Sequence, residues 1–372
     1  MTTSQSTEQL KRPAGATALR PPWSNAWTRA WETLFALRLA SYVCVLVVAS
    51  IGTYAYWVRA DTIFACQANG YGPDWYLAYC NGANYGDYEH GAFQFNLEPS
   101  VENSVKDADV LFLGDSRLQI ALSTPATQHW FAAHSTSYYL MGFSYYENAF
   151  FEGELLRRIH PHAAVYIINV NDFFVRSETI PVHLILHDPR AREKYEAKRF
   201  WQPLHEWACK RFAWICGHQF VIFRSRTTGT YRTEGAVRPK EVPVSYDRAV
   251  SQEVVDNRVP TATHFLSDFT RGKCVILTIV PYVGTQLGTA KAIARRLGLP
   301  LVTPGILPGL HTFDGYHLDQ PSARRWSRAF FKVAGPLIQS CQANRNTADQ
   351  HGRTSIAAVT SRQTPLPSAD KS

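Results

Sequence analysis

The sequence contains no CxxC pair and no HExxH motif, so nothing in it supports a metal site, and no metal or other cofactor is expected. It contains a single long apolar run, which excludes a membrane protein with several spans. Only 18% of the residues are charged, whereas 45% are hydrophobic and 13% aromatic, which excludes a disordered chain. A length of 372 residues suits one large domain or two ordinary ones.

The net charge of +8 lies mostly outside residues 60–341, which carry only +2. Residues 1–38 hold five basic and two acidic side chains, whereas residues 60–100 hold five acidic side chains and no Lys or Arg. The run between them, 39–58, has 20 residues without a charge, about 30 Å of helix, which matches the hydrocarbon core of a bilayer. The positive-inside rule therefore predicts a cytoplasmic basic arm at 1–38, a transmembrane helix at 39–58 and an exported remainder. Nucleic acid is not expected as a partner.

Two other interpretations of the apolar run stay open. A cleaved signal peptide normally has a shorter apolar region and a far shorter basic leader. A buried helix of a soluble protein would need a polar face, which this stretch lacks.

Four of the seven cysteines lie in two irregular segments, which favours short-loop disulfides in an oxidising compartment. These four are Cys66 and Cys80 in one segment, and Cys209 and Cys216 in the other. Spacing alone does not fix how they pair. Cys274 lies in an apolar run and is interpreted as a core thiol, which leaves Cys341 and Cys44 unassigned.

Short apolar runs alternate with helical patterns from residue 109 onward. Strands are predicted at 110–113, 137–141, 164–170, 274–280 and 299–302. Amphipathic helices are predicted at 125–134, 147–159, 247–269, 289–297 and 320–340. This alternation predicts an α/β domain with a mostly parallel sheet at 109–341, with ligand sites beyond the carboxyl ends of the strands.

Three segments depart from the alternation. Residues 59–108 are rich in Gly, Tyr and Asn, and residues 176–246 form an insertion too long for a plain connection. The tail at 342–372 is rich in Ser, Thr, Ala and Gln and is predicted to be disordered.

A nucleophilic serine is predicted at the end of the first strand of the sheet. Ser116 follows Gly114 and Asp115 there, and a serine nucleophile needs a base and a group that holds the base. Asp314 and His317 supply both on one turn before the last helix. The next two strand ends offer donors for a developing oxyanion, the Gly142 backbone N–H and the Asn171 amide.

These motifs resemble those of the SGNH, or GDSL-like, serine hydrolases and acyltransferases, over about 109–341. GDSR at 114–117, Gly142, Asn171 and the D-x-x-H of Asp314 and His317 are similar to that family's four blocks, although Asn169 stands where its third block usually has glycine. The resemblance implies a flavodoxin-like three-layer fold, Ser116 as nucleophile and its own N–H as an oxyanion donor. Leu118 stands where an α/β-hydrolase elbow has its second glycine, which disfavours that fold.

An exported domain on one helix resembles SGNH proteins of the bacterial inner membrane that add or remove O-acetyl groups on periplasmic envelope polysaccharides. The predicted function is therefore O-acetyltransferase or O-acetylesterase, which the triad alone does not separate. A single helix cannot carry an acyl group across a bilayer, so a transferase implies a polytopic membrane acyltransferase as partner. A lipid-directed esterase of lysophospholipase type and a non-catalytic envelope scaffold remain alternatives.

The insertion is a candidate substrate lid. From 190 to 240 it holds 12 Lys and Arg against four Glu, interleaved with aromatic residues. Rings beside cations suit an acidic glycan or a lipid headgroup. The candidate lid residues are Trp201, Trp207, Lys210, Arg211 and Trp214. The alternative is a solvated segment whose aromatic residues pack on the sheet.

Overall fold

The computed structural model describes residues 24–81, 85–235 and 241–360, and the chain divides into two compact units, Met1–Trp57 and Val58–Ser372. The first unit is dominated by helix α1 (Ser24–Asp61), in which Trp31–Asp61 is long and apolar enough to cross a membrane. The large apolar side chains along that stretch are exposed. The predicted arm is thus helical from Ser24 onward, and its first 23 residues lie outside the described part.

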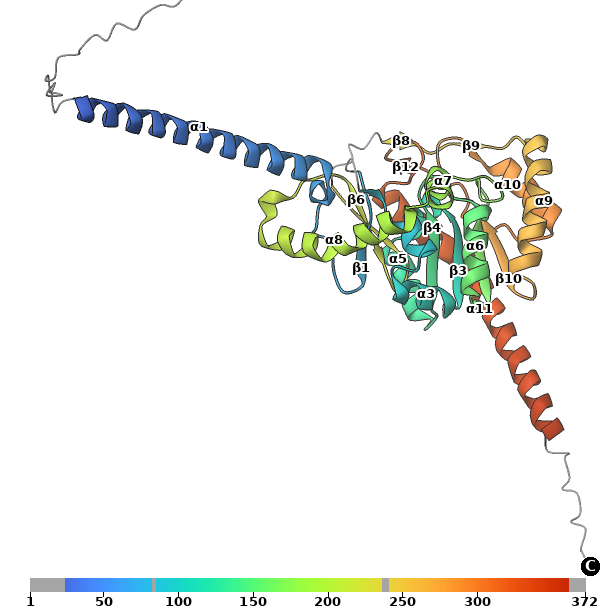
Figure 1. The fold of residues 1–372 in the computed structure, drawn as a ribbon. Helices are drawn as coiled ribbons and strands as arrows, with labels where there is room; N and C mark the ends of the chain where they lie inside the picture. The colour runs from blue at the N-terminus through green and yellow to red at the C-terminus, as the bar shows by residue number, and fades with distance from the viewer. Residues whose placement is uncertain (1–23, 82–84, 236–240, 361–372) are drawn as a thin grey trace, which may run out of the picture. The chain divides into compact units, whose positions relative to one another are not determined.

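The second unit is a mixed α/β structure around a four-stranded parallel sheet (Figure 1). Its strands are β3 (Val110–Asp115), β4 (Tyr138–Phe143), β5 (Val165–Asn169) and β10 (Cys274–Thr278), in the order β10-β5-β3-β4. These four strands confirm the predicted parallel sheet. The fifth predicted strand, 299–302, makes a single parallel bridge, between Leu301 and Leu277.

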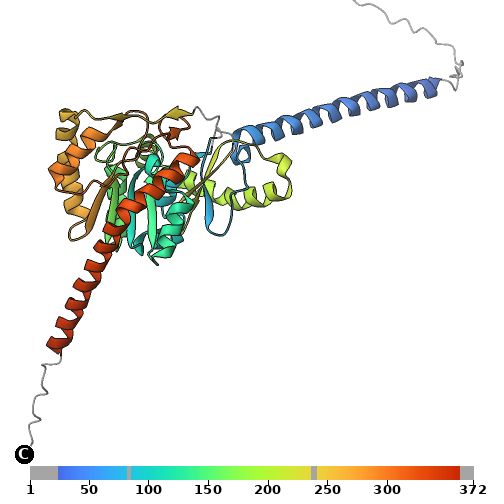
Figure 2. The same ribbon diagram turned by 180° about the vertical axis from the view of Figure 1, so that it is seen from behind.

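Helices cover both faces of this sheet. All six residues of β3 are buried, and its apolar side chains point alternately to two apolar clusters, one on each face. Leu111 and Leu113 pack in the cluster that includes α3 (Pro99–Lys106), α6 (Ala149–Ile159), α9 (Gln252–Phe269) and α10 (Leu287–Leu297). Val110 and Phe112 pack in the cluster with α4 (Ser116–Leu122), α5 (Pro125–Ala133) and α11 (Gln320–Thr360). Figure 2 shows α11 crossing that second face.

The prediction of a disordered tail is wrong for its first part. Helix α11 continues without interruption to Thr360, beyond the expected end at residue 340. The composition at 342–360 lacks the apolar periodicity by which a packed helix is recognised, and that feature led to the expectation. Residues 361–372 lie outside the described part of the chain.

Two of the three segments that depart from the alternation, 59–108 and 176–246, form a second sheet together. It is antiparallel, in the order β2-β1-β6-β7, with β1 (Trp75–Cys80) and β2 (Gly86–Asp87) from the first segment and β6 (Val221–Ser225) and β7 (Tyr231–Glu234) from the insertion. Helices α2 (Glu89–Gln94), α7 (Ile180–His187) and α8 (Ala191–Arg211) and the short helices η1 (Ile63–Ala65) and η2 (Ala213–Ile215) accompany it.

Three disulfides cross-link the second unit. Cys66–Cys80 and Cys209–Cys216 confirm the two predicted short-loop pairs. A third joins Cys274 at the start of β10 to Cys341 in α11, so the interpretation of Cys274 as a core thiol and of Cys341 as unassigned is wrong. The two lie 67 residues apart, and only the packing of α11 across the sheet brings their Cα atoms to 5.9 Å. Cys44 is the free cysteine of the described residues.

Candidate active site

Ser116 is the first residue of α4, directly after β3. Asp115 ends the strand and caps the helix, since its carboxylate accepts the backbone N–H of Arg117 at 3.0 Å. Gly114 adopts a φ of 154°, and a Cβ there would lie 2.9 Å from the Cβ of Asn169. A side-chain-free residue is therefore needed before the turn that presents Ser116.

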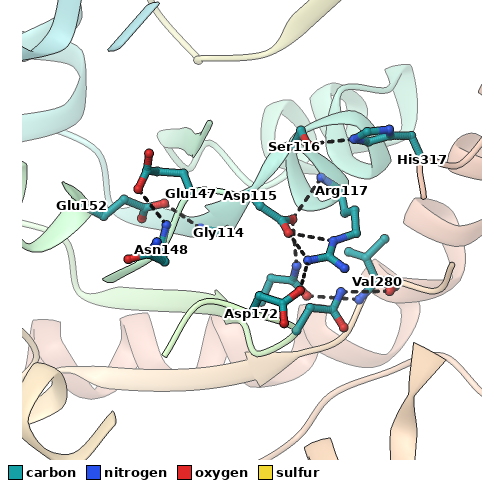
Figure 3. Close-up of polar contacts among 12 residues, drawn as sticks. Gly114, Asp115, Ser116, Arg117, Glu147, Asn148, Glu152, Asp172, Val280 and His317 are labelled. Carbon is teal, nitrogen blue, oxygen red and sulfur yellow. Dashed lines mark hydrogen bonds and ion pairs between the residues drawn. The ribbon is translucent and has the colours of Figure 1, made fainter. Parts of the chain in front are cut away.

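Glu152 of α6 supports this turn through a hydrogen bond to Gly114, drawn as a dashed line in Figure 3. Its carboxyl oxygen accepts the backbone N–H of Gly114 at 3.1 Å, and the side chain is fully buried. Burial raises the pKa of Glu152 well above its usual range, although the Gly114 N–H opposes the shift. The second carboxyl oxygen has no hydrogen-bond partner among the described residues, so Glu152 positions the turn through the oxygen that binds the Gly114 N–H.

His317 and Asp314 reach Ser116 from a turn 200 residues further along the chain. The turn follows β12 (His311–Thr312), which pairs with β8 (Val242–Pro243). The Ser116 hydroxyl oxygen lies 2.8 Å from His317 Nε2, and His317 Nδ1 lies 2.6 Å from Asp314 Oδ2. The other Asp314 oxygen accepts the backbone N–H groups of Tyr316 and His317, at 2.9 and 2.8 Å.

The partners of His317 fix its tautomer. An ionised Asp314 only accepts, so Nδ1 carries the proton and Nε2 of the neutral ring accepts from the Ser116 hydroxyl. Burial would raise the pKa of Asp314, but the hydrogen bond and charge of His317 outweigh it and lower that pKa below its usual value. The array is chemically equipped to move a proton from Ser116 to His317.

Four charged side chains near Ser116 are linked in series by ion pairs. Arg117 is almost fully buried and forms ion pairs with Asp115 and with Asp172, the latter at 2.6 Å. Arg258 of α9 binds the other oxygen of Asp172 at 2.7 Å. Burial would raise the pKa of Asp172, but Arg117 and Arg258 lower it below its usual value. These ion pairs connect the carboxyl end of β3 to the chain just after β5, beside Ser116.

The two further oxyanion donors predicted from strand ends already have partners. The Gly142 N–H donates to the side-chain oxygen of Gln119 at 3.1 Å. The Asn171 amide donates one N–H to the carbonyl of Val280 at 3.2 Å, and its own oxygen is buried without a partner among the residues that the structure describes. The structure thus brings the three triad residues together. The Gly142 N–H, however, is hydrogen-bonded to Gln119 of α4, and the Asn171 amide is hydrogen-bonded to Val280, just after β10.

Three tyrosines gather beside Arg117, the residue that follows Ser116. The Arg117 guanidinium lies over the rings of Tyr282 and Tyr146, at 4.8 and 5.6 Å from their centroids. The Tyr316 ring packs 5.9 Å from Tyr146 and 6.5 Å from Tyr282. Tyr145 and Tyr146 both have positive φ, 60° and 57°, a conformation costly for bulky side chains. Through Tyr146, the loop after β4 contacts Arg117 and Tyr316.

The candidate lid residues lie elsewhere in the unit. Helix α8 packs on η1, η2 and α7, and both ribbon views show it extending beyond the parallel sheet. Among the described residues, the ring and charge contacts of these side chains stay within the insertion, as in Trp207 with Phe212 and Lys210 with Glu206. Trp201, Trp207 and Trp214 are exposed and do not pack on the sheet.

Among the described residues, three groups have the side-chain types of a metal site. Two already have other partners, since Cys209 and Cys216 form a disulfide and His90 pairs with Asp87. The third, Glu178 with His183 and His187, is exposed around α7, where both rings contact the same carboxylate oxygen. The proton transfer described for the triad uses none of these groups.

The residues around the triad that sequence reasoning missed adjoin the motifs directly. Arg117 follows Ser116, Tyr316 precedes His317, and Tyr282 follows the end of the β10 segment. Their position beside the motifs is the signal that could have found them. Comparisons of the chain with known protein families, with curated proteins and with solved structures find no match.

Proposed function

We propose that the chain is a serine acyl-transfer enzyme of the SGNH type, anchored in the bacterial inner membrane with its catalytic unit in the periplasm. The observation that carries this proposal is the hydrogen-bonded series Ser116, His317 and Asp314 beside the carboxyl end of β3. Its substrate is an O-acetylated or acetyl-accepting envelope polysaccharide.

The strand order supports the fold part of the proposal. In chain order the parallel strands are first β3, then β4, β5 and β10, so the spatial order β4-β3-β5-β10 reads 2-1-3-4. The bridge from Leu301 to Leu277 adds a fifth position beside β10. This is the flavodoxin-like order, in which the ligand site lies beyond the carboxyl ends of the first and third strands, near Ser116 here.

The reaction proceeds through an acyl-serine. As the Ser116 oxygen attacks the ester carbonyl, His317 Nε2 takes the hydroxyl proton, and Asp314 stabilises the resulting imidazolium. His317 returns that proton to the leaving alcohol. Water or a sugar hydroxyl then gives its proton to His317 and attacks the acyl carbonyl. The bond to the Ser116 oxygen breaks as His317 returns the proton to that oxygen, which yields acetate in an esterase and a new ester in a transferase.

The developing oxyanion needs N–H donors. We keep the Ser116 backbone N–H and the second N–H of the Asn171 amide as the proposed donors. Gly142 would contribute only after Gln119 releases its N–H.

The tyrosines beside Arg117 favour a sugar substrate. The rings of Tyr146 and Tyr316 are about half exposed beside the triad, and exposed rings give a sugar an apolar face to stack on. As a transferase, the enzyme would receive its acyl group from a polytopic membrane partner, because its own single helix provides no path across a bilayer. Deleting such a co-encoded acyltransferase should then abolish polysaccharide acetylation.

Substituting Ser116 tests the proposal. In the purified full chain, Ser116→Ala should abolish acetyl-ester hydrolysis and labelling by an activated serine phosphonate, and in cells it should change the polysaccharide's acetyl content. Ser104→Ala, a half-buried serine on α3 that lies outside the candidate site, is the matched control. Unchanged hydrolysis and acetyl content in Ser116→Ala would refute the function. A clear preference for long-chain esters would redirect it to lipids.

A further inference from the structure

Helix α8 exposes an apolar stripe opposite to the face that it buries. Its buried residues, Tyr195, Gln202, His205 and Cys209, follow one side of the helix. With about 3.6 residues per turn, Phe200, Leu204 and Trp207 fall within about 60° of one another on the other side. Phe200 is 73% and Trp207 61% exposed. An unpartnered stripe of this kind marks an interaction surface.

The stripe continues into the loop after the helix. Cys209 and Cys216 close this loop with a disulfide, and it carries Phe212 and Trp214, of which Trp214 is 74% exposed. We name Phe200, Leu204, Trp207, Phe212 and Trp214 the aromatic face. Basic residues accompany it, since residues 199–218 hold three Lys and Arg against one Glu. The Arg211 guanidinium lies 5.5 Å from the centre of the Phe212 ring.

The base of this loop is bound to the chain that follows the apolar helix. The Gly217 N–H donates to the Phe64 carbonyl at 2.7 Å, and a Cβ on Gly217 would lie 2.3 Å from the Ala65 oxygen. The rings of Phe64 and His205 pack 5.5 Å apart. His205, buried and with its pKa lowered by burial to about 4, is neutral and binds the Cys66 carbonyl at 3.2 Å.

Phe64 comes five residues after Arg59, where the apolar run has just ended. Five residues span at most about 18 Å even when fully extended. The tether between a bilayer that holds the run and Phe64 is therefore at most about 18 Å long, which keeps the loop bound to Phe64 within reach of the bilayer surface. Aromatic rings with Lys and Arg at their edge are the composition that favours the interface between headgroups and acyl chains.

We propose that the aromatic face binds the surface of the bilayer in which α1 is anchored, with Lys210 and Arg211 toward acidic headgroups. The inference rests on the proposed membrane anchor. The face and the helix would then hold the catalytic unit at two points, which fixes the height and orientation of Ser116 above the membrane.

A spin label beside the aromatic face tests this in the full chain, reconstituted in nanodiscs that contain acidic phospholipid. The reporter is Ala213→Cys in a Cys44→Ala background, with mass spectrometry confirming that the Cys209–Cys216 disulfide is intact. Ala213 is exposed and leaves every ring in place. Relaxation by oxygen reports lipid and relaxation by a water-soluble nickel chelate reports water. Val333→Cys on α11, half exposed, is the control site.

At Ala213 the ratio of oxygen to nickel relaxation should be several-fold higher than at Val333. Replacing the two loop rings, with Phe212→Ser and Trp214→Ser, should return it to the Val333 value. Equal ratios at the two sites, or a ratio that the ring substitutions leave unchanged, would overturn the inference. Labelling the natural Cys44 reports the anchor separately, and a water-like label there would overturn the anchor and the inference together.

Discussion

Two histidines bound to carboxylates show how differently the two sheets use the same chemistry. His317, at the parallel sheet, has one carboxylate partner and one hydroxyl partner and a side chain that is 21% exposed. His90 of α2, beside the antiparallel sheet, is completely buried between Asp87 at 2.8 Å and Glu147 at 3.1 Å. The first has a hydroxyl at one ring nitrogen, whereas the second has a carboxylate at each ring nitrogen.

The two carboxylate partners of His90 favour its protonated form. Burial alone would lower its pKa, but the charge and hydrogen bond of Asp87 and those of Glu147 raise it to about 10. Tyr195 and Thr179 add hydrogen bonds to the two carboxylates, at 3.1 and 2.7 Å. The group therefore links β2 and α2 to the start of α6.

A second buried ion pair lies next to it. Arg224 of β6 binds Glu89 at 3.0 Å and donates to the Leu140 carbonyl of β4 at 2.7 Å, which joins the two sheets. Glu89 also accepts the N–H of Ser144 at 3.0 Å, directly before the loop that bears Tyr146. Full burial with every charge paired gives a rigid support, and partial exposure with one hydroxyl partner gives a site for chemistry.

The sharpest test of this difference, and the largest effect, is His317→Gln. Glutamine keeps a polar group near Ser116 but cannot take its proton, so ester hydrolysis should fall by about 10⁴-fold or more. The free energy of unfolding in detergent should change by less than about 1 kcal/mol, because the ring is partly exposed. A folded His317→Gln enzyme with near-normal turnover would contradict the assignment of His317 as the base.

The reverse outcome is expected for His90→Gln. It leaves Asp87 and Glu147 buried without their cation, and breaking a buried ion pair costs about 3–5 kcal/mol. Denaturant titration of the full chain in detergent measures this loss. His264→Gln, whose exposed ring pairs with Asp268, is the control and should lose less than about 1 kcal/mol. A similar small loss in both variants would mean that His90 is not structural.

The convergence of the triad could be predicted although Ser116 and His317 lie 201 residues apart. Ser116 directly follows an apolar strand that can only be buried in a parallel sheet, and the ends of such strands meet at one edge. The D-x-x-H spacing then needed only a turn to bring Asp314 and His317 there.

The support of the site could not be predicted in the same way. β1 pairs with β6 from a segment about 140 residues later, and no periodicity within either strand specifies that register. From sequence alone, the charged stretch that contains Asp87, Glu89 and His90 would be placed in solvent. Its burial is tolerable only because the distant residues Glu147 and Arg224 pair with it. The Gln119 side chain that binds Gly142 is likewise a tertiary contact.

The smallest expected effect is a dependence of stability on pH that separates His90 from His205. His90, with a pKa of about 10 when folded and about 6.5 when unfolded, gives full stabilisation below about pH 6.5 and loses it as the pH rises toward 10. His205, with its pKa lowered to about 4, contributes in the opposite direction, and its share is lost only as the pH falls from about 6.5 toward 4. From about pH 7.5 to about 8.5 the slope therefore reports His90, and one linked proton lowers the free energy of unfolding by about 1.4 kcal/mol over that unit. Denaturant titrations at the two pH values should show this slope in the wild type and a flatter one in His90→Gln, whereas parallel slopes would show that His90 is not charged in the folded chain.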